Sequence, residues 1–297
     1  MKKKKSLLQK FDGLLRKARV PKYIHHFGPK TYTTVQHCKC WLLKEKLKCS
    51  WDDLFEDHLM YYPIYDEVPD VSTLKKLMKR LPFWLKIGLV KVSAGIEEAE
   101  FGAIDATGLS RTNASQHYLK RIDRADPVKK SLKLSLYTSR NRILSFRLRS
   151  AWCGDAKDVA YLTKHSSVLA ETNCMDKGYD AQQVHEHFRN QGLYSIIPAR
   201  KGCKRGRYRK EMRDYFDYAQ YWERNCGEWN NSSLKRVYGN HVKSWNYRTQ
   251  HSEITARIIL HNLKSILQKL FHQSLNWLEI FISSSALLQP FSGTRKG

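Results

Sequence analysis

The sequence has few acidic residues for its size and no cysteines at zinc-finger spacing. Its 297 residues contain 28 Asp and Glu against 53 Lys and Arg, a formal net charge of +25. The seven cysteines are scattered without a Cys-x-x-Cys pair, so we expect reduced thiols and no structural zinc. Positive charge along the whole chain predicts a surface that binds a long polyanion, for which nucleic acid is the obvious candidate. A ribosomal or membrane-surface protein would share this composition.

Long apolar runs are also missing. The N-terminal MKKKKSLLQKFDGLL is basic but lacks an uninterrupted apolar region and a small-residue cleavage site, so no secretory signal is predicted. The most apolar stretch, 275–291, contains Glu279, several serines and Pro290, which argues against a membrane span. We therefore expect a soluble, cytoplasmic protein with no membrane contacts.

The first 95 residues predict a series of short helices. Apolar residues between Leu7 and Leu15 recur at helical spacing, 31–48 predicts a second helix, and Ser50 is placed to cap a third. Ser72 is placed to cap a basic helix that Pro82 ends. Basic helices in this number fit a DNA-binding module of helix-turn-helix type. The alternative is a helical cap whose basic face contacts solvent and binds no DNA.

The pattern changes to strands from residue 99. FGAIDATGLS, KLSLYTSR and RILSFRLRSA predict three consecutive strands, with Asp105 on the first and a hairpin at Arg140-Asn141. A helix over 156–170, a strand that ends at Met175, a helix over 181–190 and the strand LYSIIPAR follow. This order predicts an α/β fold with a ribonuclease-H-like mixed five-stranded sheet flanked by helices. The expected domains are an all-helical 1–95, a catalytic 96–272 and a tail, 273–297.

A basic segment follows the last predicted strand. Seven of the eleven residues from 200 to 210 are Lys or Arg, and glycines are frequent there. We interpret the segment as an exposed loop that grips phosphates, with a disordered basic insertion as the alternative. The residues expected to contact DNA are Arg200, Lys201, Lys204, Arg205 and Arg207.

The segment 214–237 predicts a helix that carries four functional groups on one face. Tyr221, Arg224, Glu228 and Lys235 stand at offsets of 0, 3, 7 and 14, which keeps them within roughly 60° of arc on a helix. Alone, a carboxylate between two cations predicts only a salt-bridged surface. A second helix over 253–271, capped by Ser252, is predicted to serve packing alone.

Three carboxylates occupy the positions where a ribonuclease-H-like fold places its acids. Asp105 lies on the first strand, Asp176 ends the fourth, and Glu228 lies on the last helix. Their convergence in a basic protein predicts ligands for hard cations. Separately, Asp105 would be a strand-end turn residue, Asp176 an Asx-turn and Glu228 an ion pair. Asp180 competes with Asp176 as a ligand, but we prefer Asp176 because it ends the strand.

The spacing Tyr221-x2-Arg224-x3-Glu228-x6-Lys235, with DATG at Asp105 and DKGYD at Asp176, resembles prokaryotic insertion-sequence transposases with a DDE active site and a Tyr-Arg-Glu-Lys signature. The resemblance covers roughly 70–265. The polar run before Asp176, ETNCM, departs from the buried strand usual in that family.

The resemblance implies that Asp105, Asp176 and Glu228 are the catalytic residues and hold two Mg²⁺ or Mn²⁺ ions. Tyr221, Arg224, Lys235 and the neighbouring Arg236 would contact DNA. It also implies a nucleoid-associated homodimer on DNA that cleaves transposon ends and joins their 3′ hydroxyls to a target. A ribonuclease-H-like nuclease without strand transfer and an inactive DNA-binding copy are the alternatives.

Overall fold

The computed structural model describes residues 6–24, 27, 30–111, 121, 131–150 and 153–265. The tail predicted at 273–297 lies outside the described residues. No helix within these ranges is long and apolar enough to cross a membrane.

The described residues up to 94 form helices joined by loops, as the sequence predicts. Serine and threonine caps open the first helices, because Ser6, Thr33 and Ser50 each form a reciprocal capping box with the third residue of the helix. Asp70, and not Ser72, caps the basic helix. The elements are α1 (Leu7–Lys17), α2 (Thr34–Leu47), α3 (Trp51–Asp53), the short η1 (Leu54–His58) and η2 (Leu59–Tyr61), α4 (Val71–Arg80) and α5 (Phe83–Ala94).

A five-stranded mixed sheet follows, in the order β3-β2-β1-β4-β5. The first three strands form an antiparallel meander, and β4 and β5 add in parallel beside β1. This topology confirms the predicted ribonuclease-H-like sheet, including the hairpin at 140–141, where Arg140 adopts a positive φ. The strands are β1 (Phe101–Leu109), β2 (Leu132–Ser139), β3 (Arg142–Arg149), β4 (Thr172–Met175) and β5 (Tyr194–Ile196).

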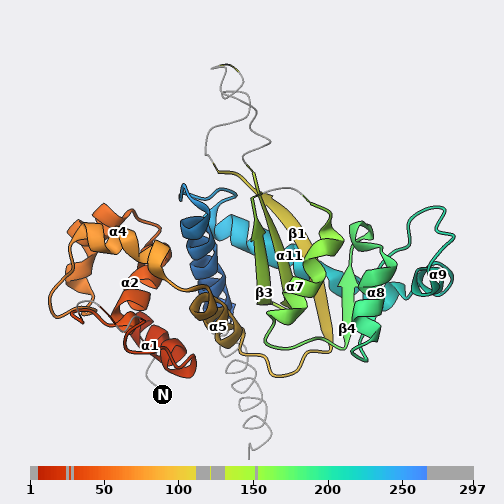
Figure 1. Cartoon of the computed structure of the whole chain (residues 1–297), viewed down its shortest axis with the longest axis horizontal. Helices are drawn as coiled ribbons and strands as arrows, with labels where there is room; N and C mark the ends of the chain where they lie inside the picture. The colour runs from red at the N-terminus through yellow and green to blue at the C-terminus, as the bar shows by residue number, and fades with distance from the viewer. Residues whose placement is uncertain are drawn as a thin grey trace, which may run out of the picture.

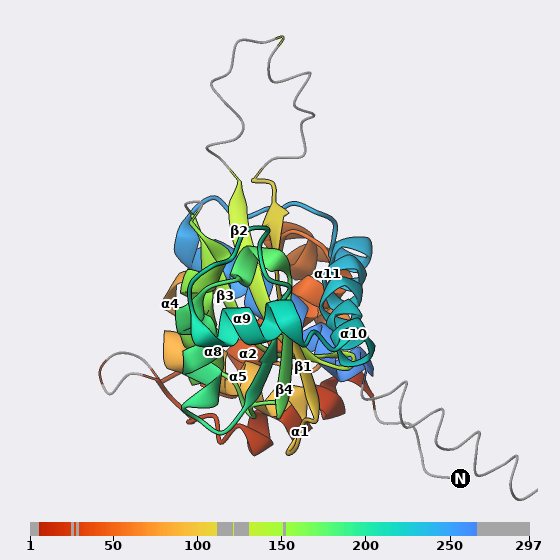
Figure 2. The ribbon, with the colours of Figure 1, turned by 90° about the vertical axis from the view of Figure 1, so that its right-hand side faces the viewer.

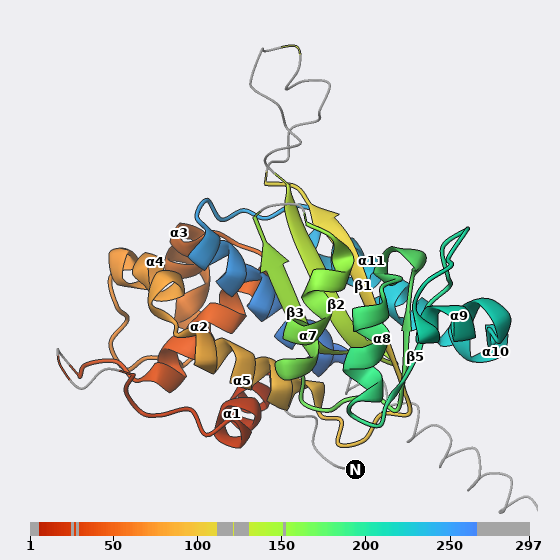
Figure 3. The ribbon, with the colours of Figure 1, turned by 45° about the vertical axis from the view of Figure 1, so that its right-hand side comes forward.

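Helices cover both faces of the sheet (Figures 1 and 3). The apolar faces of α7 and α8 pack on one side through Val159, Leu162, Val184 and Phe188. On the other side lies α11, which contacts β1 and β2. The remaining elements are η4 (Asp155–Asp158), α7 (Val159–Lys164), η5 (Lys177–Tyr179), α8 (Gln182–Arg189), α9 (Arg207–Asp214), α10 (Tyr218–Tyr221), η6 (Trp222–Arg224) and α11 (Asn225–Tyr238).

Two predicted helices have different bounds in the structure. The helix expected over 156–170 ends at Lys164, and the one expected over 214–237 is three segments, α10, η6 and α11. Asp217 opens α10 because its carboxylate accepts a hydrogen bond from the Gln220 N–H at 2.9 Å. Gly239, with φ +82°, ends α11 as predicted.

A last helix, 247–265, lies between the N-terminal helices and the sheet (Figure 1). Residues 250–262 are all buried. Ser252 does not cap it: Asn246 does, by accepting a hydrogen bond from the Thr249 N–H, while Ser252 donates to the Met78 carbonyl of α4. At the other end, Asn262 hydrogen-bonds both the N–H and the carbonyl of Ile143 on β3. The helix therefore joins the N-terminal helices to the sheet.

The polar run before Asp176 forms a buried strand because its amide is fully satisfied. Asn173 on β4 accepts a hydrogen bond from the Tyr137 hydroxyl at 2.7 Å and donates to the Ala170 carbonyl at 2.8 Å. The hydrogen bonds to these partners compensate for the desolvation of the buried amide. The strand therefore reaches Met175 as predicted.

We expect Gly102→Ala to destabilise the protein by about 1–3 kcal/mol through overpacking. A Cβ at residue 102 would lie 2.8 Å from both the Ala170 Cβ and the Tyr137 ring, inside van der Waals contact. Chemical denaturation measures the change. Gly88→Ala in α5 is the matched control, because nothing lies within 4 Å of its Cβ position, and it is expected to stabilise by about 0.5–1 kcal/mol. Equal stability of the two variants would contradict the expected clash.

Candidate active site

Asp105 and Asp176 each come directly after a residue that is paired between the adjacent parallel strands β1 and β4. Ile104 of β1 is in register with Met175 of β4, and paired strands lie about 4.8 Å apart. Asp105 lies on the face of β1 that α11 covers, because a Cβ on Gly227 of α11 would lie 3.1 Å from the Asp105 Cβ. The absence of a side chain at 227 lets the helix approach this closely. The structure thus places the first two predicted acids side by side, where β4 ends beside the middle of β1.

The Asp105 carboxylate is partly buried, and its surroundings favour the protonated form. Burial raises the pKa of Asp105, and the negative charge of Asp176 raises it further, against the lowering effect of a hydrogen bond from Asn231 and of the Arg224 charge. Asn231 Nδ2 donates to Asp105 Oδ2 at 2.8 Å. An arrangement that disfavours a carboxylate charge is relieved by a bound cation.

Asp176 is the better ligand candidate of the two aspartates near β4. Its carboxylate caps η5 by accepting a hydrogen bond from the Gly178 N–H at 2.7 Å, the predicted Asx-turn, which leaves its other oxygen free of that turn. Asp180 is buried and bound by Arg209 through two hydrogen bonds of 2.7 and 2.8 Å. The Arg200 N–H also donates to it. Asp180 is therefore committed to holding α9 against α8.

Glu228 forms an ion pair with Arg224 at 2.5 Å, the arrangement expected for a salt-bridged helix surface. Its side chain is 53% exposed. Arg224 also interacts electrostatically with Asp105 and lies 5.7 Å from the centre of the Tyr221 ring. A guanidinium therefore lies among the predicted acids, where it supplies positive charge to the carboxylates.

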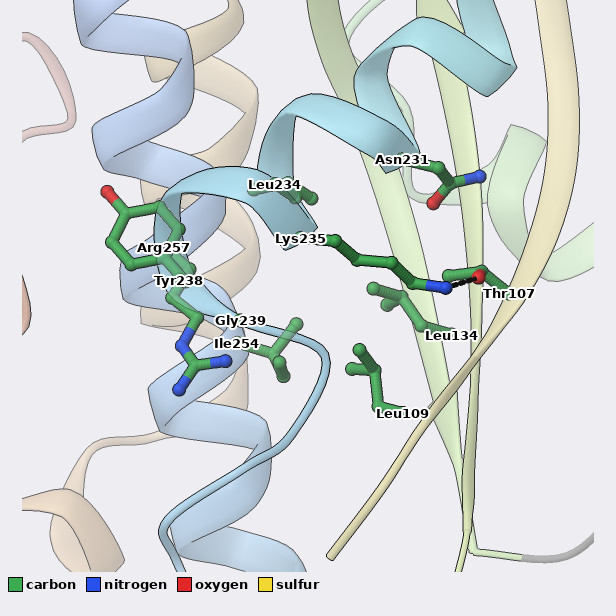
Figure 4. A pocket seen from close by; sticks show the side chains of 10 residues that line it. All are labelled: Thr107, Leu109, Leu134, Asn231, Leu234, Lys235, Tyr238, Gly239, Ile254 and Arg257. Atoms are coloured by element: carbon green, nitrogen blue, oxygen red, sulfur yellow. Dashed lines mark hydrogen bonds between the residues drawn. The ribbon is translucent and has the colours of Figure 1, made fainter. Parts of the chain in front are cut away.

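Asp105 and Glu228 line one open depression of about 610 Å³, together with Asn231, Ser232, Lys235, Arg236 and Asn240. Lys235 reaches across from α11 and donates a hydrogen bond to the Thr107 hydroxyl (Figure 4). Thr107 is two residues beyond Asp105, on the same face of β1. The helix face predicted from the sequence therefore lies against the strand that carries Asp105.

The donor set fits a hard cation in type. All three predicted ligands supply carboxylate oxygens, and Asp105 and Asp176 are adjacent. As they stand, however, no three His, Cys, Asp or Glu side chains of the described ranges are close enough to hold a metal together. Glu228 faces Arg224, and it would have to leave that ion pair to join the aspartates.

The basic segment projects beyond β5 at the end of the molecule opposite the N-terminal helices (Figures 1 and 2). Arg200, Lys201, Lys204, Arg205 and Arg207 are all exposed. The prediction of a loop throughout is wrong from Arg207 onwards, because α9 begins there, after Gly206 with φ +93°. Arg200 also donates to the Gly178 carbonyl at 3.1 Å, which ties this segment to the turn that carries Asp176.

If the basic segment binds DNA phosphates, Lys204→Gln with Arg205→Gln should lower the slope of log affinity against log salt by about 2. At 0.1 M salt the affinity should fall on the order of 50-fold, because each neutralised phosphate releases about 0.9 counterion. Fluorescence anisotropy with duplex DNA over a salt series measures both. Lys157→Gln with Lys164→Gln removes the same charge from exposed positions near α7 and should leave the slope nearly unchanged. An equal loss in the two double variants would contradict phosphate contact by this segment.

Two features of the site have no signal in the sequence pattern. Asn231 contacts Asp105 across 126 residues of chain, a pairing that helix periodicity does not reveal. Trp222 and Trp245 are 75% and 96% exposed, and Tyr215 and Tyr218 are also exposed. Neither tryptophan is packed in the core. Their exposure is the kind that permits stacking on bases.

The raised pKa of Asp105 predicts a pH-dependent cost to stability. Folding favours its protonated form, so the cost is absent below the unfolded value of 3.8 and develops as pH rises through the folded pKa. In a chelator, Asp105→Asn is therefore expected to be more stable than the wild type at neutral pH, and the difference should vanish in acid. Thermal melts over a pH series measure it. An Asp105→Asn variant that is less stable at pH 7 would contradict the burial argument.

The strand order, the pairing of the strands and the helices on both faces define a ribonuclease-H-like fold. No protein-family model matches the chain, and no curated protein does. Among solved structures, the chain is similar to a piggyBac transposase in a synaptic complex with hairpin DNA. That similarity has a TM-score of 0.41 at 9% sequence identity, and it covers 87% of this chain and 73% of the other.

Proposed function

We propose that this protein is a DDE transposase that cleaves DNA at transposon ends and transfers the 3′ hydroxyls to target DNA. The observation that carries the proposal is the position of Asp105 on β1 beside Asp176 at the end of β4 in a ribonuclease-H-like sheet, with Glu228 on the helix that covers the same face. A net charge of +25 and the exposed basic segment supply a surface for the DNA.

Asp105, Asp176 and Glu228 would hold two Mg²⁺ or Mn²⁺ ions, which would activate a water or 3′ hydroxyl and stabilise the leaving oxygen. The other residues act on the DNA. Arg224 is placed to grip a phosphate, because its planar guanidinium can bind two phosphate oxygens at once. When it does so it releases Glu228. Lys235, with Arg236 beside it, adds positive charge at the rim of the depression.

This exchange gives the site two states. Without DNA, Glu228 neutralises Arg224. With a phosphate on Arg224, Glu228 is free to join the aspartates. A protein that completes its ligand set only on its substrate is protected against indiscriminate cleavage, and two DNA ends held together would require a homodimer.

A nuclease without strand transfer would use the same residues, so the products decide between the two activities. The test uses the full-length protein with labelled DNA that carries the ends of its own element, taken from the flanks of its reading frame, and a supercoiled target plasmid. Products are separated on gels with Mg²⁺, with Mn²⁺ and with chelator.

Metal-dependent cleavage followed by joining of labelled ends to the plasmid is the expected result. Cleavage without joining would contradict the proposed transposase and support a nuclease without strand transfer. DNA binding without cleavage in the presence of either metal ion would contradict the proposed enzymatic activity and favour an inactive DNA-binding copy.

A further inference from the structure

Among the residues that the structure describes, Asn231 is the side-chain amide that hydrogen-bonds a predicted acid. It stands three residues after Glu228 on α11, so the two side chains point to the same side of the helix. Its Nδ2 donates to Asp105 Oδ2 at 2.8 Å. Glu228 is largely exposed, whereas only 6% of Asn231 is exposed. Both line the depression that Asp105 lines, and Figure 4 shows Asn231 one turn before Lys235, directed at the sheet.

The other end of this amide has no partner. Asn231 Oδ1 is buried and forms no hydrogen bond with any residue that the structure describes. The NH2 group faces Asp105 in this structure, as an ionised carboxylate requires, because an ionised carboxylate only accepts hydrogen bonds. A buried acceptor without a donor costs about 1–3 kcal/mol. Fold stability alone therefore does not explain an asparagine at this position.

The surroundings of Asp180 and Asp105 differ in a way that explains the choice of an amide. Asp180 is buried and held by the guanidinium of Arg209, and this partner neutralises its charge. Asp105 is partly buried and held by an amide, which fixes the carboxylate through a hydrogen bond but adds no positive charge. A carboxylate that is oriented by a neutral group is available to a cation.

We propose that Asn231 is a positioning residue for Asp105. Its NH2 group holds the Asp105 carboxylate in the orientation that binds a divalent cation. This inference rests on the proposed function, because it assigns a role to Asn231 within the same site. Outer partners of metal ligands typically change metal affinity by about 10- to 100-fold.

The test measures Mn²⁺ binding by electron paramagnetic resonance of the free ion, without DNA and without turnover. Asn231→Ala and the similarly sized Asn231→Leu both remove the donor, and circular dichroism checks that they fold. Ser232→Ala is the matched control, because Ser232 is the next residue, lines the same depression and is exposed. We expect the Asn231 variants to bind Mn²⁺ about 10- to 100-fold more weakly and Ser232→Ala to bind as the wild type does.

A double-mutant cycle with Asp105→Asn shows whether Asn231 acts through Asp105. In the Asp105→Asn background, removal of the Asn231 amide should have no further effect on Mn²⁺ affinity. If the wild type binds Mn²⁺ through Asp105 and the folded Asn231 variants bind equally well, the positioning role is wrong. If Asp105→Asn itself leaves Mn²⁺ binding unchanged, the metal site of the proposed function fails instead.

Discussion

Asp158→Ala is expected to destabilise the protein by about 3–5 kcal/mol, the cost of removing one partner from a buried ionic network. Asp158 is fully buried, and its carboxylate binds Lys133 at 3.2 Å, Arg149 at 2.6 Å and the Ser135 hydroxyl at 2.7 Å. Lys133 is itself only 1% exposed. Without Asp158, its charge would lose one of two carboxylate partners and remain buried, with Asp155 as the other.

The same network gives this prediction a pH dependence. Burial alone would raise the pKa of Asp158, but the hydrogen bonds from Ser135 and Arg149 and the Lys133 charge outweigh it and lower the pKa. A lowered pKa contributes stability above the unfolded value of 3.8, and this stability is lost as pH falls through the folded pKa. The gap between wild type and variant should therefore be widest at neutral pH and narrow in acid.

Urea denaturation at several pH values measures this gap. Asp214→Ala is the control, because Asp214 forms an ion pair with Arg213 on the surface, where both side chains are exposed, and surface pairs contribute little. A loss below 1 kcal/mol for Asp158→Ala at pH 7 would show that the network does not hold the fold together.

Glu228→Gln should reduce metal-dependent DNA cleavage by at least about 1000-fold, because a bound metal ion contributes several kcal/mol to the transition state. The amide keeps the size of the side chain but removes the negative charge that a cation requires. DNA binding without metal should be unchanged or slightly tighter, since the Arg224 guanidinium is released from its ion pair.

Glu223→Gln is the matched control for this experiment. Glu223 lies five residues earlier, is exposed and carries the same charge, but it does not line the depression. The Glu223→Gln variant should cleave DNA at the wild-type rate. Full activity in Glu228→Gln, with a gel assay under single-turnover conditions, would remove Glu228 from the active site.

The sheet was predictable because its signals are local. Alternating apolar and polar residues over much of 132–149 indicate β2 and β3, and the two-residue turn between them sets the pairing next to it. An irregularity at Tyr137 and Thr138 shifts the register farther from the turn. The helix α5 gave no such signal, because FWLKIGLVKVSA is apolar on several sides and a helix that is buried broadly has no polar face to mark its period. The start of α9 was not predicted, because the glycines before it favour a loop. The sequence RYRKEMRD is itself a good helix former.

The site was predictable where its signals are local. The chain order places Asp105 on one strand and Asp176 directly after another, and these strands become neighbours. The ion pair of Glu228 with Arg224 follows from their spacing of four residues on one helix. The Asn231 contact was not predictable, because it depends on how closely α11 approaches β1 at Gly227, and tertiary packing of this kind leaves no period in the sequence.

The helix 247–265 has a mechanical consequence for a DNA-bound form. Its Arg257 contacts Glu45 of α2, and its His261 contacts Asn230 of α11, so this helix contacts both the N-terminal helices and the helix that covers the sheet. A DNA segment gripped by α1 to α5 would then sit at a set distance from Asp105. The distance between the N-terminal helices and Asp105 would then set the place of cleavage along the DNA.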